Sequence, residues 1–530
     1  MNPALAGTGP LLRASLKQEA RNFAPWIVVV TALSASSIIV YPYIFPTQAD
    51  RQGLAAAVGA NPAISLIFGP ARDLSTVEGF NAWRSLALGG FLSALMAIFA
   101  VVRATRAQED SGQAELLASG VLGRPARLVV AVAMASLASL VLGVVSAVAT
   151  GLSGSDWQAA CLLCATFTVT GLMFAAVAAV AAQIGSDART ASTIAVGTLG
   201  TLFLLRGYLD TMDFSAWLSW LTPLGWMEET RPGTDNTWWP LLLGVAFTAV
   251  VLAVAAALQG RRDFGQGSIA PRPGPDRGMT TSTGLLAWRL NRGPALTWMI
   301  AFLLLGSVFG SLSTSITDLL SGNSAASAVL TGGATSPGAL VGSFLVTILS
   351  LLGIIASVGG VQTMLKVRSE ELEDRVEPLL ATAVTRPAYL GSNILIALAA
   401  PTAALLVGGA VVSLIAGTAN IGVSVGDGLL QTLATVPAMW TVVAVSVAVI
   451  GARPQVKIAA WIGVVASFAL TLLGPTFKLP DWALGISPFW HVPHVTAASP
   501  YWLGVLWVSL FTLAFLVIGL AGFRRRDLAR

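Results

Sequence analysis

Residues 106–124 read RAQEDSGQAELLASGVLGR, and residues 368–386 read RSEELEDRVEPLLATAVTR. In both stretches a Glu follows the first Arg by three residues, a second Glu follows it by nine, and a closing Arg follows it by eighteen. The offset between the two copies is 262 residues, about half of the 530-residue chain. We call these stretches the first arm and the second arm. A long internal repeat indicates a duplicated architecture, so the rest of the chain is best compared half against half.

The aligned charged residues of the two arms are the candidate site residues. They are Arg106 with Arg368, Glu109 with Glu371, Glu115 with Glu377, and Arg124 with Arg386. In each arm the first Arg and the first Glu stand three residues apart, which allows them to pair along a helix. One interpretation is a solvated connector whose charges pair only with each other. Because the spacing is repeated in two halves that diverge elsewhere, the pattern favours a docking surface.

The composition excludes a water-soluble protein. The chain is 55% hydrophobic and only 10% charged, whereas soluble domains carry roughly 25% charged residues. So little charge cannot cover a water-exposed surface, which indicates a polytopic membrane protein. The two cysteines, Cys161 and Cys164, lie inside one apolar run and are expected to be small core residues rather than a redox pair. No cleavable signal peptide is evident, so we expect the first span to act as the insertion signal.

Twelve apolar stretches are long enough to cross a bilayer, which takes about 20 residues. They lie near 25–45, 85–103, 127–150, 158–183, 191–208 and 238–259, and then near 296–314, 340–364, 388–417, 428–451, 457–474 and 503–522. Six spans in each half give both halves the same orientation. The sequence therefore predicts an all-α polytopic membrane protein with 12 transmembrane helices, arranged as two parallel six-helix repeats whose pseudo-twofold axis runs along the membrane normal.

Five segments follow from this pattern. They are an N-terminal interfacial helix (1–24), a first six-span half (25–260), a linker with a second interfacial helix (261–295), a second six-span half (296–523) and a basic tail (524–530). In the first segment Leu12 and Leu16 fall on one helical face, while Arg13 and Lys17 fall on another. That pattern is typical of an amphipathic helix in the membrane interface. An ordinary solvated helix is the alternative.

The distribution of Lys and Arg predicts the orientation. Most of the 30 basic residues fall on the side that holds both termini, both arms and the linker. The positive-inside rule places that side in the cytoplasm, so we expect a multi-pass protein of the cell membrane. The outer loops near 209–237 and 475–502 carry Trp and Pro, including Trp217 and Trp482. Anchoring of these indole rings at the interface is favoured over direct contact with a substrate.

The chain has no catalytic signature of its own. It lacks the GxxxxGK[ST] phosphate loop and the HExxH motif, so we expect a transport subunit rather than an enzyme, with no cofactor, no metal and no nucleic acid. His491 and His494 are spaced for a metal pair, but Pro493 between them disfavours a shared helical face. The predicted spans carry no carboxylate in mid-membrane, where such a group is costly and is retained mainly for function. The energy source is therefore expected to lie in another subunit.

The arm pattern R-x-x-E-x-x-x-x-x-E-x-L resembles the first cytosolic loop of ABC-2 type permeases, the type V exporters. Further features point to the long actinobacterial permeases that export polyketide antibiotics, the tetronasin type. These features are the basic N-terminal helix, Glu115-Leu-Leu-Ala-Ser119, Arg124-Pro125, Pro223-Leu-Gly-Trp226, Arg231-Pro232, Trp238-Trp239-Pro240-Leu241, the Arg261-Arg-Asp263 tail with its Pro-rich linker, and Gly522-Phe-Arg-Arg-Arg-Asp527. Each is weak alone, and their common order carries the resemblance over nearly the whole chain.

The resemblance implies an ATP-driven exporter of hydrophobic or amphipathic small molecules such as drugs and antibiotics. Two copies of a separate ATP-binding subunit, which holds the ATP and Mg, would dock beneath the two halves. The segments around Glu115 and Glu377 would be the coupling helices, and an apolar cavity would lie on the pseudo-twofold axis between spans 2 and 5. The second arm departs from the first because Pro378 stands where the first has Leu116, so the two contacts are not expected to be equivalent.

Two rival functions stay open from the sequence. One is a secondary transporter driven by an ion gradient, and the other is a membrane relay that passes ATPase movement to another protein without transporting anything. The sequence assigns no residue to substrate binding.

Overall fold

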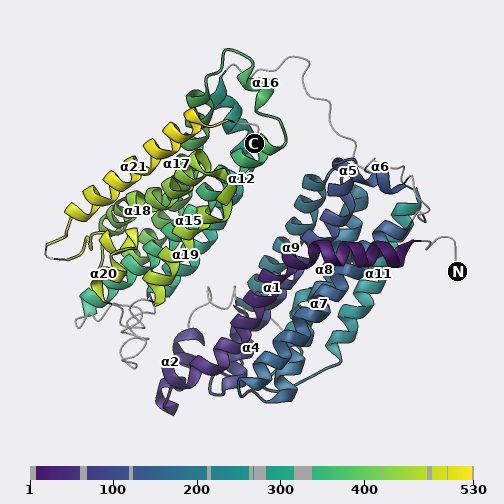
Figure 1. The fold of residues 1–530 in the computed structure, drawn as a ribbon. Helices are drawn as coiled ribbons and strands as arrows, with labels where there is room; N and C mark the ends of the chain where they lie inside the picture. The colour runs from purple at the N-terminus through teal and green to yellow at the C-terminus, as the bar shows by residue number, and fades with distance from the viewer. Residues whose placement is uncertain are drawn as a thin grey trace. The chain divides into compact units, whose positions relative to one another are not determined.

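A computed structural model of the chain describes all residues except 1–6, 60–67, 119–122, 124, 212–215, 262–266, 268–281, 315–336, 420–421, 474–479, 498 and 528–530. All regular elements of the described residues are helices, and they form two compact units, Met1–Gly274 and Pro275–Arg530 (Figure 1). The division between the units lies inside the stretch that the sequence predicts to be a linker. Most of that linker, and the predicted outer loop near 315–339, fall outside the described residues.

Unit 1 is a bundle around helix α8. Its helices are α1 (Thr8–Ile44), α2 (Gln48–Gly59), α4 (Val77–Val102), η2 (Arg103–Ala107), α5 (Gln108–Asp110), α6 (Gln113–Ala118), α7 (Ala126–Leu152), α8 (Trp157–Ile184), α9 (Ala188–Thr211), η3 (Ala216–Leu221), α10 (Pro223–Glu228) and α11 (Pro240–Arg261). Helix α8 packs against α4, α7 and α11. Small residues bring these helices together: Gly171 of α8 lies against Ser93 and Ser139, as is common between helices in membranes.

Helix α1 covers both the predicted interfacial segment and the predicted first span. Pro25 lies inside it, and a proline there removes one helical hydrogen bond and favours a bend. Figure 1 shows α1 changing direction, with its N-terminal part lying across the bundle and the rest running along it. In the N-terminal part, Leu12 and Leu16 pack against the core of unit 1, whereas Arg13 and Lys17 are exposed.

Unit 2 is a bundle around helix α18. Its helices are α12 (Thr283–Thr314), α15 (Pro337–Leu372), α16 (Glu377–Leu380), α17 (Arg386–Thr418), α18 (Val425–Ala452), η4 (Pro454–Trp461), α19 (Ile462–Phe468), η5 (Ala469–Leu473), α20 (Asp481–Leu484), η6 (Pro488–His491) and α21 (Leu503–Arg525). Helix α18 packs against α15, α17 and α21. In chain order these are the second, third and last long helices of the unit, which are also the positions of the neighbours of α8 in unit 1.

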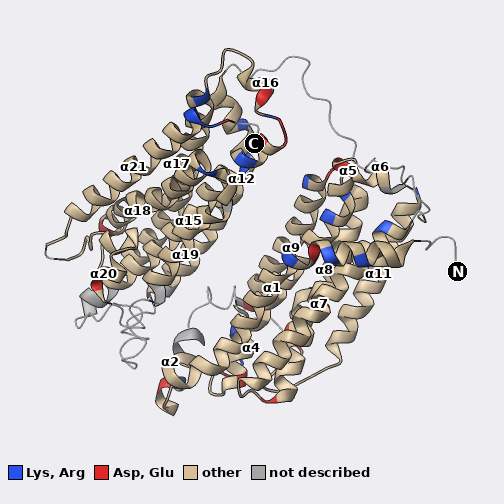
Figure 2. Cartoon of the chain, viewed as in Figure 1, with Lys and Arg blue, Asp and Glu red and all other residues tan. Residues whose placement is uncertain are grey.

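Eleven helices of the described residues are long and apolar enough to cross a membrane. The remaining predicted span, 457–474, is instead a series of shorter pieces: η4, α19 and η5. Val456 has non-helical φ/ψ angles within η4, and η5 is a π-helical turn, so no single α-helix forms there. Figure 2 shows charged residues gathered towards the two ends of each bundle, with an almost uncharged stretch between. The chain is a polytopic helical membrane protein.

Candidate coupling site

The first arm begins with a change of helix type at the end of α4. Helix α4 passes into the π-helical turn η2 and then into the single turn α5. Gly112 follows with a φ of 74°, in the left-handed region that glycine enters without strain. This turn starts the separate short helix α6, which carries Glu115. The first arm therefore has an inner part, which continues the membrane helix, and an outer part on α6.

The inner part of the first arm contains a buried ion cluster. Arg106 is 0% exposed, and its Nη1 donates to Oε2 of Glu109 at 2.8 Å. Arg127, at the start of α7, donates to the other oxygen of Glu109 at 3.3 Å and to the carbonyl of Thr105 at 2.9 Å. One carboxylate thus joins two guanidinium groups from consecutive membrane helices. The i, i+3 pair predicted from the spacing forms, and it anchors the inner arm rather than facing solvent.

The inner part of the first arm also contacts two later helices. Arg106 Nε donates to the carbonyl of Ala182 in the last turn of α8 at 2.5 Å, a position where a cation also complements the helix dipole. Asp110 accepts a hydrogen bond from the backbone N–H of Ala188, the first residue of α9, at 2.8 Å. The inner part of the first arm is therefore hydrogen-bonded to the end of α8 and to the start of α9.

The start of α9 has a second carboxylate cap. Asp187 accepts hydrogen bonds from the backbone N–H of Thr190 and from its hydroxyl, both at 2.8 Å. Burial acts to raise the pKa of Asp187, but the hydrogen bonds from Thr190, Ser186 and the Arg189 backbone outweigh it and hold the pKa below its usual range. The carboxylate is therefore ionised at neutral pH and complements the helix N-terminus.

The outer part of the first arm is exposed. Glu115 is exposed, and Leu116 beside it is 77% exposed, although Ala114 is fully buried and fixes one side of α6. An exposed leucine beside an exposed carboxylate on a short helix is suited to contact with another protein. The side chains of Leu117 and Val121, predicted to share an apolar face with Leu116, and the whole of Arg124 lie outside the described residues.

The second arm repeats the buried pair with a different partner. Arg368 donates to Oε2 of Glu371 at 2.8 Å. Arg526, just after α21, donates to the other oxygen of Glu371 at 2.5 Å. Arg386 in turn donates to the backbone carbonyl of Arg526 at 2.9 Å. The last membrane helix of unit 2 is thus tied to the second arm, whereas Arg127 of the third span fills the equivalent place in the first arm.

The outer part of the second arm differs in shape. Asp374 has a φ of 55°, and it occupies the same position in the repeat as Gly112. Helix α16 then begins only at Glu377, with Pro378 in its first turn, where a proline is tolerated because no helical N–H is needed. Glu377 is exposed, while Leu379 packs against the core of unit 2. The two outer helices therefore differ: α16 is shorter than α6 and begins at the Glu itself, as the Pro378 of the second arm leads one to expect.

Of the eight charged residues singled out in the sequence, the structure describes seven, since Arg124 lies outside the described residues. Four are buried or nearly so and are paired, namely Arg106, Glu109, Arg368 and Glu371; Arg386 is partly buried; and Glu115 and Glu377 are exposed. Sequence reasoning missed Arg127, Arg526, Asp110 and their backbone partners. A signal existed for Arg127 and Arg526, because both are basic residues at the ends of predicted spans, where they could also have been expected to pair with the arm carboxylates.

The other candidates of the sequence show no site. Among the described residues, no group of three or more His, Cys, Asp or Glu is placed to hold a metal ion. His491 Nε2 lies 2.9 Å from the carbonyl of Gly485, a local contact. Cys164 is buried in the core of unit 1.

Comparison with known proteins agrees with an efflux permease. A family model described as "Multidrug efflux system permease Rv1217c, C-terminal domain" matches residues 49–259 and 280–524. The multidrug efflux system permease protein Rv1217c of Mycobacterium tuberculosis is 35% identical over 98% of this chain and 95% of its own length. The chain belongs to the Rv1217c permease family. Both arms fall inside the ranges matched by the Rv1217c family model, so the duplicated motif lies within the part that the family shares.

Proposed function

We propose that the chain is the permease subunit of an ATP-driven ABC exporter, and that a separate ATP-binding subunit supplies the energy. The observation that carries the proposal is found in both arms: an exposed Glu on a short helix, just beyond a buried Arg–Glu pair. Such a pair fixes the membrane helix, and the exposed carboxylate is left for a partner. The name of the Mycobacterium tuberculosis relative, an efflux system permease, supports the same function.

In this proposal two copies of the ATP-binding subunit dock at the cytosolic face, one at Glu115 on α6 and one at Glu377 on α16. Arg106, Glu109, Arg368 and the remaining arm charges stiffen the connection to the spans. The permease binds no nucleotide itself, and the ATP and Mg belong to the partner subunit.

In the first half, force would pass from the first arm to the later spans through the hydrogen bonds of Arg106 and Asp110. A push on α6 reaches α5 through the turn at Gly112. From there it reaches α8 through Arg106 and Ala182, and α9 through Asp110 and Ala188. A push on the first arm would therefore act on spans 4 and 5 as well as on spans 2 and 3, which the arm connects. The helices tilt as rigid bodies, since packed cores do not deform continuously.

Force in the second half would travel by another route. Glu371 joins the second arm to Arg526 at the end of the last span, so a push on α16 acts on spans 2, 3 and 6. The two ATP-binding subunits would therefore deliver unequal movements. This difference adds to the difference in shape between the two outer helices, where Leu116 of the first arm is replaced by Pro378 in the second.

The finer architecture is part of the proposal. Twelve spans, two parallel repeats and cytoplasmic termini are supported by the repeated arms and by the equivalent neighbours of α8 and α18. The cargo would be a hydrophobic or amphipathic small molecule, because the spans carry so little charge. The narrower resemblance to the tetronasin-type exporters stays a prediction.

One observation favours the rival that uses an ion gradient. In unit 1 the buried Arg206 faces two buried carboxylates, Asp210 at 3.6 Å and Glu228. When two carboxylates share one cation, a proton can neutralise the second carboxylate. We place this cluster near the outer end of α9, away from mid-membrane, and assign it a structural role in fixing α10 against α9.

Inverted membrane vesicles that contain the chain and its ATP-binding subunit test the proposal. We expect ATP to drive uptake of a hydrophobic dye into the vesicles, and a catalytically dead ATP-binding subunit to abolish it. Collapse of the proton gradient should leave the uptake unchanged. Uptake that continues without the ATP-binding subunit and follows the proton gradient would overturn the proposal in favour of the secondary transporter.

A further inference from the structure

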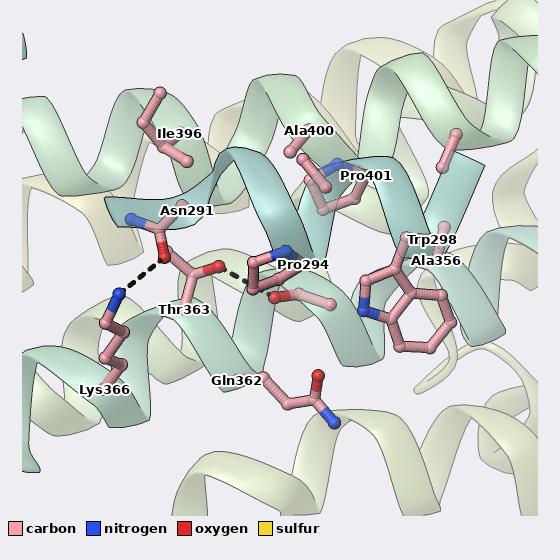
Figure 3. A pocket seen from close by; sticks show the side chains of 13 residues that line it. Asn291, Pro294, Trp298, Ala356, Gln362, Thr363, Lys366, Ile396, Ala400 and Pro401 are labelled. Carbon is pink, nitrogen blue, oxygen red and sulfur yellow. Dashed lines mark hydrogen bonds between the residues drawn. The ribbon is translucent and has the colours of Figure 1, made fainter. Parts of the chain in front are cut away.

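A cavity of about 220 Å³ lies within unit 2, between α12, α15 and α17 (Figure 3). Its walls include Pro294 of α12 and Pro401 of α17, together with Gly359 of α15. Prolines within helices remove a hydrogen bond and favour local bending, and glycine adds no side chain. The three helices therefore separate here for reasons that lie in their own sequences.

The lining is polar at one end and aromatic at the other. Lys366 donates to the carbonyl of Leu290 at 3.0 Å and to Oδ1 of Asn291 at 3.3 Å. Leu290 is four residues before Pro294, so its carbonyl has no helical N–H partner from that position, and the lysine takes this place. Trp298 forms the other end, and Gln362 lies between Lys366 and Trp298 (Figure 3).

The charge in this cavity has one sign. The residues that line it include one cation, Lys366, and no carboxylate. The Lys366 ammonium group also lies 3.9 Å from a carboxylate oxygen of Glu370, which is not part of the lining. The Gln362 amide is exposed, and no hydrogen bond joins it to another residue that the structure describes. The cavity is therefore suited to an acceptor group, and above all to an anion.

We propose that this cavity binds the head of an amphipathic cargo molecule, with an aromatic ring against Trp298 and an acidic or hydrogen-bond-accepting group at Lys366 and Gln362. The inference rests on the proposed export function and adds a ligand class and a site. A cavity of roughly 150 Å³ holds benzene, whereas pockets for whole drug-sized ligands run from about 300 Å³. The volume here fits a bicyclic ring with its head group.

The other half of the chain lacks this chemistry. At the repeat offset of 262 residues, Gln362, Thr363 and Lys366 correspond to Ala100, Val101 and Ala104, which are all buried in unit 1. The lysine and the glutamine therefore distinguish unit 2 from unit 1. The two halves, already unequal in their arms, would also be unequal towards the cargo.

The test compares two fluorescent probes that share a naphthalene ring and differ in charge, dansylglycine (carboxylate) and dansylcadaverine (amine). Binding is measured by fluorescence titration on the full chain in phosphatidylcholine nanodiscs, without the ATP-binding subunit. The variants are Lys366→Gln, which removes the cation, and Ala400→Phe, which fills the cavity. Lys17→Gln is the matched control, because it removes an exposed lysine from the other half.

We expect dansylglycine to bind the wild type more tightly than dansylcadaverine. Lys366→Gln should weaken dansylglycine about tenfold, the size of one lost charge-assisted hydrogen bond, and leave dansylcadaverine unchanged. Ala400→Phe should abolish binding of both probes, and Lys17→Gln should have no effect. Equal binding of dansylglycine to the wild type, Lys366→Gln and Ala400→Phe would overturn the proposal.

A further titration distinguishes a cargo molecule from a lipid as the ligand of the cavity. If phosphatidylglycerol in the nanodiscs displaces dansylglycine from the wild type, the cavity holds a lipid headgroup and the cargo assignment is wrong. Because these titrations use neither ATP nor the partner subunit, they are independent of the vesicle experiment. If the probes bind but ATP drives no uptake, the export function is rejected and the binding site stands. If ATP drives uptake but the probes do not bind, the binding site is rejected and the export function stands.

Discussion

Replacement of Glu109 by Gln is expected to destabilise the protein because it breaks a buried ion cluster. The carboxylate of Glu109 accepts hydrogen bonds from Arg106, which is 0% exposed, and from Arg127. The amide oxygen of Gln could still accept one hydrogen bond, but its NH₂ group would face a second guanidinium, and the negative charge would be lost. Removing one member of a buried pair typically costs about 3–5 kcal/mol.

The lower end of that range applies, since Glu109 is itself 10% exposed. A loss of about 3 kcal/mol in a bundle of this size lowers the melting temperature by roughly 6 °C. The measurement is the temperature at which half of the detergent-solubilised chain is lost from its size-exclusion peak. Glu371→Gln should behave similarly or more strongly, because that carboxylate is 1% exposed and joins Arg368 to Arg526.

Glu115→Gln is the matched control. It makes the same chemical change in the same arm at an exposed position, where substitutions usually stay within about 0.5 kcal/mol. We therefore expect a shift of about 1 °C or less. If Glu109→Gln shifts the melting temperature no more than Glu115→Gln does, the buried cluster does not anchor the arm, and the division into inner and outer parts is wrong.

Two further predictions concern other parts of the chain. A Cβ at Gly451 would overlap the backbone of Gly519 where α18 meets α21, so Gly451→Ala should cost about 1–3 kcal/mol, whereas Gly391→Ala, with nothing near its Cβ, should not destabilise. Asp187→Ala should cost about 1 kcal/mol by removing the cap of α9, visible as faster amide exchange in the first turn of that helix.

The sequence predicted the arms and their internal pairs, because an i, i+3 spacing is a local property of a helix. It could not show that Arg106 is buried while Glu115 is exposed, since both belong to one charged stretch. Their burial depends on Arg127, Ala182 and Ala188, which reach the arm only after the bundle has formed. Contacts of this kind are set by packing and leave no periodic pattern.

Hydropathy located eleven long helices correctly but failed to show the interruptions at 454–473. An apolar composition indicates that a segment partitions favourably into a membrane. It does not predict the backbone geometry, which here departs from helix at Val456. The cavity of unit 2 was also missed, because no single helix indicates it. Pro294 and Pro401 lie more than a hundred residues apart, and only packing brings them to one cavity.

Substrate-stimulated ATP hydrolysis by the assembled complex tests whether the arms receive force from the ATP-binding subunit. The complex is prepared with the wild-type chain, with Glu115→Gln and Glu377→Gln singly and together, and with Glu78→Gln at the opposite end of α4 as the control. We predict that the double variant folds normally and that its substrate stimulation of ATP hydrolysis is at least tenfold smaller than that of the wild type. The two single variants should differ from each other in this stimulation, and Glu78→Gln should retain the wild-type stimulation. Full stimulation in the double variant would contradict the coupling role of the two arms.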